Sequence, residues 1–477
     1  MKLLTIRKIL FGLLLSVFTV PAMGQNASIG TDSVLSLGLP VVLVTTVDAE
    51  EPSCEYVSHP EGCIGDGTKN ATKVPGRVVV RQGNDVLFDS GDYLKKESGM
   101  TIKIRGNSSA YQDKKSFKIK LEKKGDMLSR GDDKTYKDKN WVLLKNDVLC
   151  LNTLIGMKTQ ELLHRGWTPA VRCVNVVING DYRGVYMLGE AVERNEKCRI
   201  DVDKNNGYVI EEDPYWWNED VSFAGGYLSD WYLDYFKYTF KYPDADELTP
   251  EQLSYIKTAV YNLEKSIEDG TYPDYMDVRS FASWLLAHDL LGDNDSAGSN
   301  MFLTKYDDTA ESKFRMGPLW DFDAIMRMPD IWARIHDEYY FGRLFGSSNR
   351  TFAETYEALW NEITPTFFDE MTAFLQAYPQ TEEGKAAERS RQADWDRWAD
   401  SNFNPKGGTL AEDVVAAVNW FTARKAFLSS QIATLGVSTV SADKPLRSGE
   451  YYNLQGQRVS PTTKGLLIHN GRKVFNQ

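Results

Sequence analysis

The chain has 477 residues, of which 42% are hydrophobic and 26% are charged, and its formal net charge is −12. This composition is typical of a globular protein that is long enough for two or three packed units. The acidic balance argues against a nucleic-acid partner, because a phosphate backbone requires a basic face. It is compatible with a protein that handles phosphate through a bound divalent cation.

The first 24 residues predict an export signal peptide. A basic start is followed by an apolar run over residues 9–20, and Ala22 and Gly24 supply the small residues that a signal peptidase reads. The run is shorter than the roughly 20 apolar residues that span a bilayer. We therefore expect a mature protein that is secreted, periplasmic or at the cell surface, with no membrane span after signal cleavage.

The next part of the chain predicts a strand-rich region. It begins with a compact β-branched run at 39–46, and in later segments hydrophobic residues alternate with polar ones at period two. Phe117 and Ile119 face a core, for example, while Lys118 and Lys120 face the other side. A linker at 25–38 comes first. The predicted strands and one helix then form a sheet that carries this helix. The strands are at 39–46, 77–81, 101–105, 116–121, 171–177 and 184–188, and the helix is at 151–164.

Beyond about residue 245 the hydrophobic period becomes helical. Thr249 and Gln252 form a capping box with Pro250 at the first helical position, and Gly292 ends the following helix. Pro365 is the place where we expect a break in a later helix. The predicted helices span 249–268, 278–291, 352–374, 382–400 and 409–436, and residues 437–477 predict a small β tail.

The five cysteines are unevenly spaced. Cys54 and Cys63 bracket a short loop, and in an exported chain this spacing favours a local disulfide. Cys173 and Cys198 pair only if their segments are neighbours. The odd count leaves at least one thiol free, for which Cys150 is the best candidate. No cysteine or histidine cluster has the spacing of a structural zinc site.

Candidate catalytic groups lie in two neighbouring segments. Asp295 and Asn300 are five positions apart in a polar loop before the predicted strand 301–305, which is the spacing of a protein-kinase catalytic loop. In that chemistry the aspartate orients or deprotonates an acceptor hydroxyl, and the asparagine holds a metal ion. Asp321, followed by Phe322, corresponds to the aspartate that binds Mg²⁺ against the nucleotide phosphates.

A kinase-like site also needs a cation for the phosphates. Lys118 and Lys120 follow a turn of small residues whose backbone allows close approach to phosphate. Either lysine fits the nucleotide-holding role, and Arg105 on the neighbouring strand is a third candidate. The competing interpretation is a solvated basic edge that discourages strand pairing, which is the commonest reason for alternating lysines.

Several sequence blocks occur in a fixed order along the chain. They are Ile104–Ser109, Lys114–Leu121, Trp141–Leu144, Gly184–Glu190, Asn294–Asn300, Trp320–Asp323 and Trp420–Arg424. In this order they are similar to the signature of the CotH kinase family, named after a spore-coat protein, and the likeness runs from residue 39 to 436. The sequence of the tail resembles the C-terminal tails of many secreted proteins from the Bacteroidetes.

The resemblance implies an α+β, two-lobed atypical protein-kinase-like fold. Its strand-rich N-lobe would span about 39–200 and its helical C-lobe about 201–436, followed by the small β tail at 437–477. The implied activity is that of an exported kinase, which transfers phosphate from ATP, with Mg²⁺ or Mn²⁺, to a Ser or Thr of a protein substrate.

The resemblance also implies roles for single residues. Asp295 would be the catalytic aspartate, Asp321 the metal-binding one, and Asn300 would assist. Asp323 would be a further metal residue or would support the metal site. Asp293 competes with Asp295 for the catalytic role, because both lie in the same acidic segment.

Two other functions stay open. A catalytically weak or inactive kinase-fold surface protein would bind a polysaccharide or a partner protein, which Trp216 and Trp217 favour because exposed aromatic rings stack on sugars. Scarcity of ATP outside the cytoplasm favours it too. A hydrolase with paired carboxylates is the second, with Glu211–Asp213, or Asp321 and Asp323, as acid and base.

Overall fold

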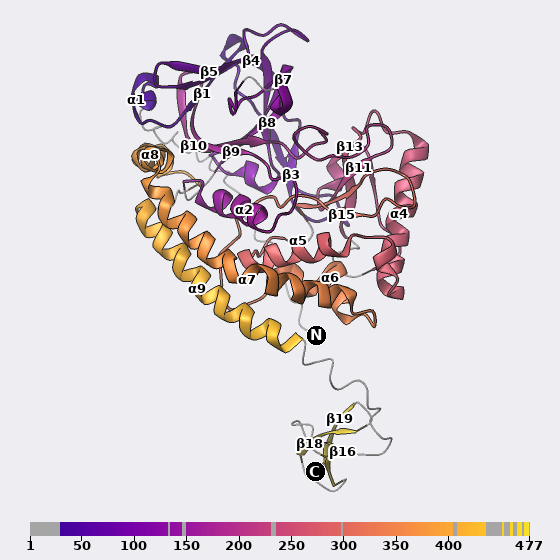
Figure 1. The fold of residues 1–477 in the computed structure, drawn as a ribbon. Helices are drawn as coiled ribbons and strands as arrows, with labels where there is room; N and C mark the ends of the chain where they lie inside the picture. Colours follow the sequence, from indigo (N-terminus) through magenta and orange to yellow (C-terminus); the bar gives the residue numbers. More distant parts are fainter. Residues whose placement is uncertain are drawn as a thin grey trace, which may run out of the picture.

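The computed structural model places a strand-rich N-terminal region before a helical region, and the fold is therefore mixed α+β (Figure 1). It describes residues 29–131, 134–145, 149–229, 235–296, 299–403, 408–435, 451–452, 458–460, 465–469 and 472–476. The predicted signal peptide lies outside these residues. The predicted linker is described from residue 29 and contains a short helix, α1 (Thr31–Ser36).

Seven of the described strands in the N-terminal region close into a barrel. Their order is β1-β9-β10-β8-β7-β6-β4, and β4 pairs back onto β1. The pair β1–β9 is parallel and the other neighbours are antiparallel. The strands are β1 Val41–Thr46, β4 Val74–Gln82, β6 Met100–Arg105, β7 Ser116–Gly125, β8 Asp138–Lys145, β9 Val171–Ile178 and β10 Asp181–Glu190, and β5 Asp85–Asp89 pairs with β4 outside the ring.

The barrel interior confirms the predicted strand faces and corrects the predicted sheet. Phe117, Ile119 and Leu121 are buried in one hydrophobic cluster with residues from the other strands. The expected sheet is closed into a barrel, because β1 pairs with strands on both sides. β7 lies between β6 and β8, so Lys118 and Lys120 do not protect an edge. The interpretation of these lysines as a basic edge is therefore wrong.

The helices of the C-terminal region begin and end close to their sequence signals. Thr249 and Gln252 make both bonds of the capping box, and Gly292 ends its helix in the left-handed conformation. The helix around Pro365 continues without the expected break. The helices of this region are α4 Pro250–Asp269, α5 Val278–Leu291, α6 Tyr339–Gly346, α7 Thr351–Ala377, α8 Glu382–Trp398 and α9 Leu410–Leu435, while α2 Leu151–Leu162 lies between β8 and β9 in the sequence.

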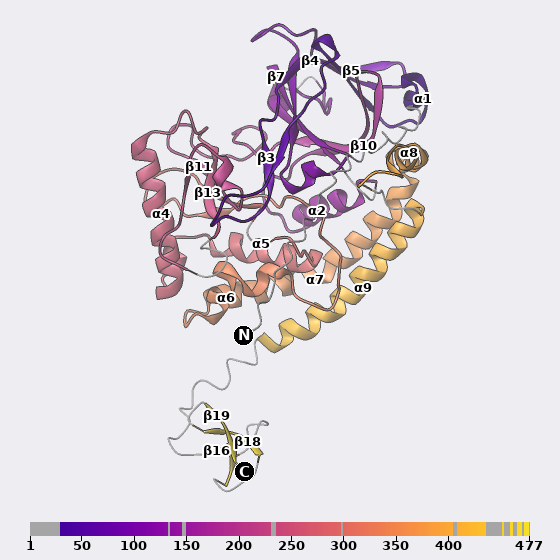
Figure 2. The same cartoon turned by 180° about the vertical axis from the view of Figure 1, so that it is seen from behind.

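The helical region also contains a five-stranded sheet among its described residues, which extends the single strand that the sequence predicted there. Its order is β12-β13-β11-β14-β15. The strands are β11 Tyr208–Asp213, β12 Ser222–Phe223, β13 Lys237–Tyr242, β14 Met301–Lys305 and β15 Arg315–Met316. Both views of the molecule place α2 between the barrel and the layer of α5 and α7 (Figures 1 and 2). The large hydrophobic cluster of this region includes residues of α2, α5, α7 and α9.

A small hairpin near the N-terminus corrects the expected disulfide. Strands β2 (Glu55–Val57) and β3 (Gly67–Lys69) pair between Cys54 and residue 69, and Cys54 and Cys63 are both free thiols. Backbone pairing and the contact of His59 with Asp66, at 2.8 Å, hold this hairpin instead. The predicted Cys54–Cys63 bond is therefore wrong.

The predicted β tail is present as a separate sheet in the order β17-β16-β18-β19. Its described strands are β16 Tyr451–Tyr452, β17 Arg458–Val459, β18 Gly465–His469 and β19 Arg472–Asn476. Among the residues that the structure describes, none of the helices combines the length and the apolar character that crossing a bilayer requires.

Candidate active site

Two loops carry the predicted acidic residues, and the backbone holds them together. The first follows α5 and the second follows β15. The N–H of Asn294 donates to the carbonyl of Ala324 at 3.3 Å, and the N–H of Met326 donates to that of Leu291 at 2.9 Å. Gly292 starts the first loop with φ +56°, and a Cβ there would lie 2.7 Å from the ring of Trp420. The loops are thus fixed against each other and against α9.

The two candidate catalytic aspartates have different environments. Asp293 is buried, and its carboxylate contacts His288 Nδ1 at 2.9 Å and accepts from the backbone N–H of Asp295 at 2.9 Å. The side chain of Asp295 instead faces solvent. Both oxygens of Asp293 are engaged within the protein, so the carboxylate that a substrate can reach is that of Asp295.

Negative charge is concentrated around Asp295 and Asp321. Partial desolvation in the loop, followed by the charges of Asp321 and Asp293, raises the pKa of Asp295 to about 6. Desolvation also raises the pKa of Asp321, although the attraction of Arg105 opposes the rise. An excess of acidic charge of this kind is typical of functional sites, and a bound cation would relieve it.

Two of the predicted metal residues have a left-handed backbone. Asn300 has φ +60° and Asp321 has φ +63°. This conformation is unfavourable for residues other than glycine, although asparagine and aspartate tolerate it best. Surrounding contacts must therefore hold the two residues in place, and such strain is concentrated at functional sites in proteins.

Helix α2 holds the loop of Asp321 from one side. A Cβ on Gly156 would lie 2.2 Å from the ring of Phe322, so the ring packs directly on the helix backbone. The side chain of Gln160 accepts from the N–H of Leu319 at 2.8 Å and donates to its carbonyl at 3.2 Å. The residues on both sides of Asp321 are thus fixed to α2.

Helix α9 holds the same region from the other side through Arg424. This fully buried guanidinium donates to the carbonyl of Asp289 at 2.6 Å, to that of Pro329 at 3.1 Å, and to that of Ile331. The carboxylate of Asp289 contacts His336 Nδ1 at 2.8 Å and accepts from the hydroxyl of Tyr356 at 2.8 Å, so it is engaged within the protein. Arg424 therefore links α9 to the end of α5.

The barrel contributes basic residues that face these loops. Arg105, at the end of β6, and Lys145, at the end of β8, line a small cavity of about 40 Å³ together with Asp321 and Asp323. Lys145 Nζ lies 3.9 Å from Asp323 Oδ2. Burial lowers the pKa of Arg105 and the charge of Asp321 opposes this. Sequence reasoning did not assign Lys145 a role, although it directly follows the block Trp141–Leu144.

The other two predicted cations lie further along the same barrel face. Lys118 and Lys120 line a pocket of about 290 Å³ with Lys103 and Lys241. Lys118 pairs with Lys103 across the strands, as Ser116 pairs with Arg105, so this pocket and the small cavity follow one another along β6 and β7. The structure therefore separates Arg105, which lies beside the aspartates, from the two lysines.

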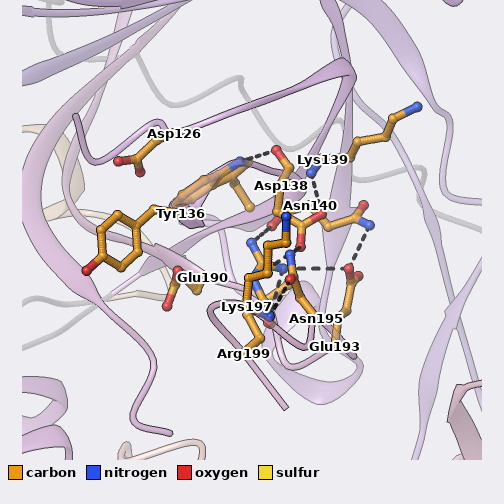
Figure 3. Close-up of polar contacts among 12 residues, drawn as sticks. Asp126, Tyr136, Asp138, Lys139, Asn140, Glu190, Glu193, Asn195, Lys197 and Arg199 are labelled. Atoms are coloured by element: carbon orange, nitrogen blue, oxygen red, sulfur yellow. Dashed lines mark hydrogen bonds and ion pairs between the residues drawn. The ribbon is translucent and has the colours of Figure 1, made fainter. Parts of the chain in front are cut away.

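A partly buried network holds the acidic partner of Lys118 (Figure 3). Lys118 Nζ lies 3.0 Å from the carboxylate of Glu193, which also accepts from Asn140 at 2.8 Å. The guanidinium of Arg199 is buried and lies 3.6 Å from both Glu193 and Asp138. Sequence reasoning missed Glu193, because its contact with Lys118 joins segments that are 75 residues apart in the sequence.

Lys114 is the first lysine of the block that contains Lys118. It is buried between the barrel and α8 and does not line either pocket. It is fully buried, and its Nζ contacts Asp394 Oδ1 of α8 at 2.8 Å. The same oxygen accepts from the N–H of Val185 at 2.8 Å. Lys114 therefore connects the barrel to α8.

The residues behind the hydrolase and sugar-binding alternatives have structural partners. Glu211 pairs with Lys241 at 2.5 Å, while Glu212 is buried on the opposite face of β11. Trp216 donates to a backbone carbonyl at 2.9 Å and Trp217 packs against Gly67. These contacts give Glu211, Glu212, Trp216 and Trp217 a place in the packing of the protein.

The donor set around Asp321 fits a cation that arrives with a phosphate ligand. The residues that the structure describes contain no group of three or more His, Cys, Asp or Glu side chains placed to hold a metal ion. Mg²⁺ needs no such cage, because it usually keeps several waters and binds one or two carboxylates together with substrate phosphates. Asp321 and Asp323 line one cavity and provide the hard oxygen donors that it prefers, and Asn300 lies in the loop that carries Asp295.

Comparison with known proteins identifies the family. The family described as CotH kinase protein matches residues 102–382, which is more than half of the chain. The chain belongs to this family. The matched part of the CotH kinase protein family contains every predicted site residue, from Arg105 to Asp323, whereas Asp394 and Arg424 lie beyond it. No curated protein matches the chain.

A solved structure that is similar to this CotH-family chain comes from Shewanella oneidensis MR-1, in the complex described as toxin–antitoxin system HipA, HipB and its operator DNA. The identity is 12% and the TM-score is 0.25, with 62% of this chain and 59% of that chain covered. The CotH-family chain thus spans less than two thirds of that protein. At this TM-score the likeness carries no argument about fold or function.

Proposed function

We propose that this CotH-family protein is a two-lobed protein kinase, which binds Mg-ATP, or Mn-ATP, and transfers the terminal phosphate to a Ser or Thr hydroxyl of a protein. The nucleotide would lie between the basic barrel face and the two acidic loops. The observation that carries the proposal is the meeting of Arg105 and Lys145 with Asp321 and Asp323 around one cavity. Phosphoryl transfer rests on such positioning and charge neutralisation.

The proposed roles follow from which carboxylates a substrate can reach and from the charges around them. Asp295 would accept the proton of the acceptor hydroxyl, since its carboxylate faces solvent beside Asp321, whereas that of Asp293 is engaged. A pKa of about 6 leaves Asp295 mostly ionised at neutral pH and basic enough to take a proton. Asn300, Asp321 and Asp323 would hold the cation, whose chemistry is to neutralise phosphate charge.

The basic groups would bind the phosphates by position along the barrel. Arg105 lies nearest to Asp321 and would contact the phosphates closest to the cation. Lys118 is oriented by Glu193, which parallels the lysine–glutamate pair of protein kinases, and Lys120 lies on the same strand face. We include both lysines in the nucleotide site because the two pockets are consecutive along β6 and β7.

A thermal-shift experiment tests nucleotide binding. Mg-ATP and Mn-ATP are titrated into the mature protein and into Asp321→Asn, with Asp308→Asn as a control at an exposed aspartate. We expect a metal-dependent rise in melting temperature for the wild type and the control, and no rise for Asp321→Asn. An equal rise in Asp321→Asn would contradict the metal role.

A transfer experiment then separates catalysis from binding. Labelled γ-phosphate should appear on a protein acceptor with the wild type and not with Asp295→Asn, while Asp295→Asn keeps its Mg-ATP thermal shift. The absence of transfer by a wild type that binds Mg-ATP would favour the catalytically inactive protein that binds a partner or a polysaccharide.

We also propose that the protein is exported, on the strength of the signal-peptide pattern in residues 1–24. Cell fractionation with an antibody against the mature chain tests this, and recovery of the full-length chain in the cytoplasm would contradict it. A secreted kinase would need ATP, or another phosphate donor, outside the cytoplasm.

A further inference from the structure

Two buried cysteines lie against each other at the junction between the barrel and α2. Cys150 precedes α2 and Cys173 is in β9, and their sulfur atoms are 3.5 Å apart. Both side chains are fully buried. Sequence reasoning had instead considered Cys173 with Cys198 and had left Cys150 free. The structure shows that the neighbour of Cys173 is Cys150.

We propose that Cys150 and Cys173 form a disulfide bond when the chain folds under oxidising conditions. The sulfur atoms are already in van der Waals contact, and a disulfide needs a further approach to about 2.05 Å. The proposal does not depend on the kinase function. It requires an oxidant, which we identify by class as a small-molecule or protein disulfide.

The bond would form by two exchange steps. The thiolate of one cysteine attacks the disulfide oxidant and releases one of its thiols, which leaves a mixed disulfide. The second cysteine then attacks the sulfur of the first and releases the other oxidant thiol. The chain loses two electrons and two protons, and the oxidant is reduced to two thiols.

The environment determines when this reaction occurs. The hydrogen bond to Cys150 and burial raise the pKa of Cys173, which disfavours the reactive thiolate in the folded protein. Ala386 and Ala387 of α8 belong to the hydrophobic cluster that contains both cysteines. In the folded protein α8 therefore covers the pair, which limits the access of oxidants and protects a finished bond from reductants.

The position of the pair gives the bond a consequence for the fold. Cys150 precedes the helix whose Gly156 and Gln160 hold the segment around Asp321. A bond from Cys150 to β9 would therefore fix the start of α2 to the barrel. It would also close a loop between residues that are 23 positions apart in the sequence, which restricts the unfolded state.

Mass spectrometry tests the pairing directly. The wild type is refolded with oxidised glutathione, denatured, alkylated without reduction and digested. We expect a linked peptide that contains Cys150 and Cys173, and alkylation of Cys54, Cys63 and Cys198. Alkylation of both Cys150 and Cys173, or a bond from either to another cysteine, would overturn the proposal.

Thermal unfolding tests the structural effect in the same preparation. Reduction in denaturant followed by refolding with a reductant should lower the melting temperature by roughly 5 °C. Cys54→Ser should keep this sensitivity, whereas Cys150→Ser should melt at the same temperature with and without reductant. A wild type that contains the bond but shows no sensitivity would overturn its stabilising role.

Discussion

The basic barrel face and the two acidic loops show two ways of placing charged side chains around one site. Arg105 and Lys118 are on hydrogen-bonded strands of a closed barrel, where pairing with both neighbours fixes the backbone. Asp295 and Asp321 are on loops without regular structure, and Asp321 has a left-handed backbone. The barrel residues are positioned by their own strands, whereas the loop residues depend on distant helices.

This difference indicates which substitutions would disturb the site. The loop segment around Asp321 relies on Gly156 and Gln160 of α2 and, through the end of α5, on Arg424 of α9. A change in these supports alters the site without touching a functional group. On the barrel face, we expect a functional side chain to be replaceable with little effect on folding.

The largest effect is expected from Arg424→Leu. Removal of the guanidinium leaves the buried carbonyls of Asp289, Pro329 and Ile331 without this donor. We expect a loss of about 3 kcal/mol in the free energy of unfolding, measured by urea denaturation. Lys425→Leu is the control on the same helix, with an expected change within about 0.5 kcal/mol. Equal losses in the two variants would contradict the role of Arg424.

Gly156→Ala should have the next largest effect. Alanine is the better helix former by about 1 kcal/mol, so a loss of stability must come from the clash with Phe322. We expect a net loss of about 1–3 kcal/mol in urea denaturation and a smaller Mg-ATP thermal shift. Lys158→Ala on the same helix should leave the thermal shift intact. A more stable Gly156→Ala with a full thermal shift would show that Phe322 moves away freely.

Asp295→Asn should raise stability at neutral pH. The pKa of Asp295 is raised to about 6, so its contribution to folding is favourable below its ordinary value, near pH 4, and is lost as pH rises through 6. After allowance for its contact with solvent, we expect a gain of about 1 kcal/mol at pH 7.5 that shrinks towards pH 4. Denaturation curves across this pH range, with Asp308→Asn as control, measure it. A gain that does not vary with pH would contradict the raised pKa.

Lys118→Met should have the smallest effect on stability. The pair with Glu193 is half-exposed, and Glu193 keeps Asn140 as a partner, so we expect a change below about 1 kcal/mol. Mg-ATP affinity should nevertheless fall by roughly tenfold if this lysine holds phosphate. Titration of Lys118→Met beside Lys120→Met shows which lysine matters, and Lys124→Met is the control. Unchanged affinity in both site variants would exclude these lysines from the site.

Much of the barrel face follows from local pattern. Alternation in 116–121 predicts that Phe117 is buried and that Lys118 and Lys120 share the other face, and the strand register confirms this arrangement. Alternation does not show that β1 closes the barrel, because the pairs of β1 with β4 and β9 join segments far apart in the sequence. Nor does it show that β7 lies between β6 and β8, and this pairing on both sides is why Lys118 and Lys120 do not form a free edge.

In the acidic loops, the sequence identifies the candidate residues but the structure decides between them. Their composition identifies Asp295, Asn300 and Asp321 as candidates, because kinase-like chemistry needs these residue types at this spacing. The spacing to Asn300 favours Asp295, but Asp293 lies in the same acidic segment and competes with it. The buried contact of Asp293 with His288 distinguishes them.

The sequence by itself determined the family blocks, the helix ends at capping boxes and glycines, and the candidate acids, because these depend on residues close together in the chain. Tertiary structure alone decided the barrel closure, the contact of Cys150 with Cys173 and the supports of Asp321. Each of these joins segments whose spacing carries no local signal. Burial and close approach, rather than residue type, then set which side chain reaches the site and which one packs beneath it.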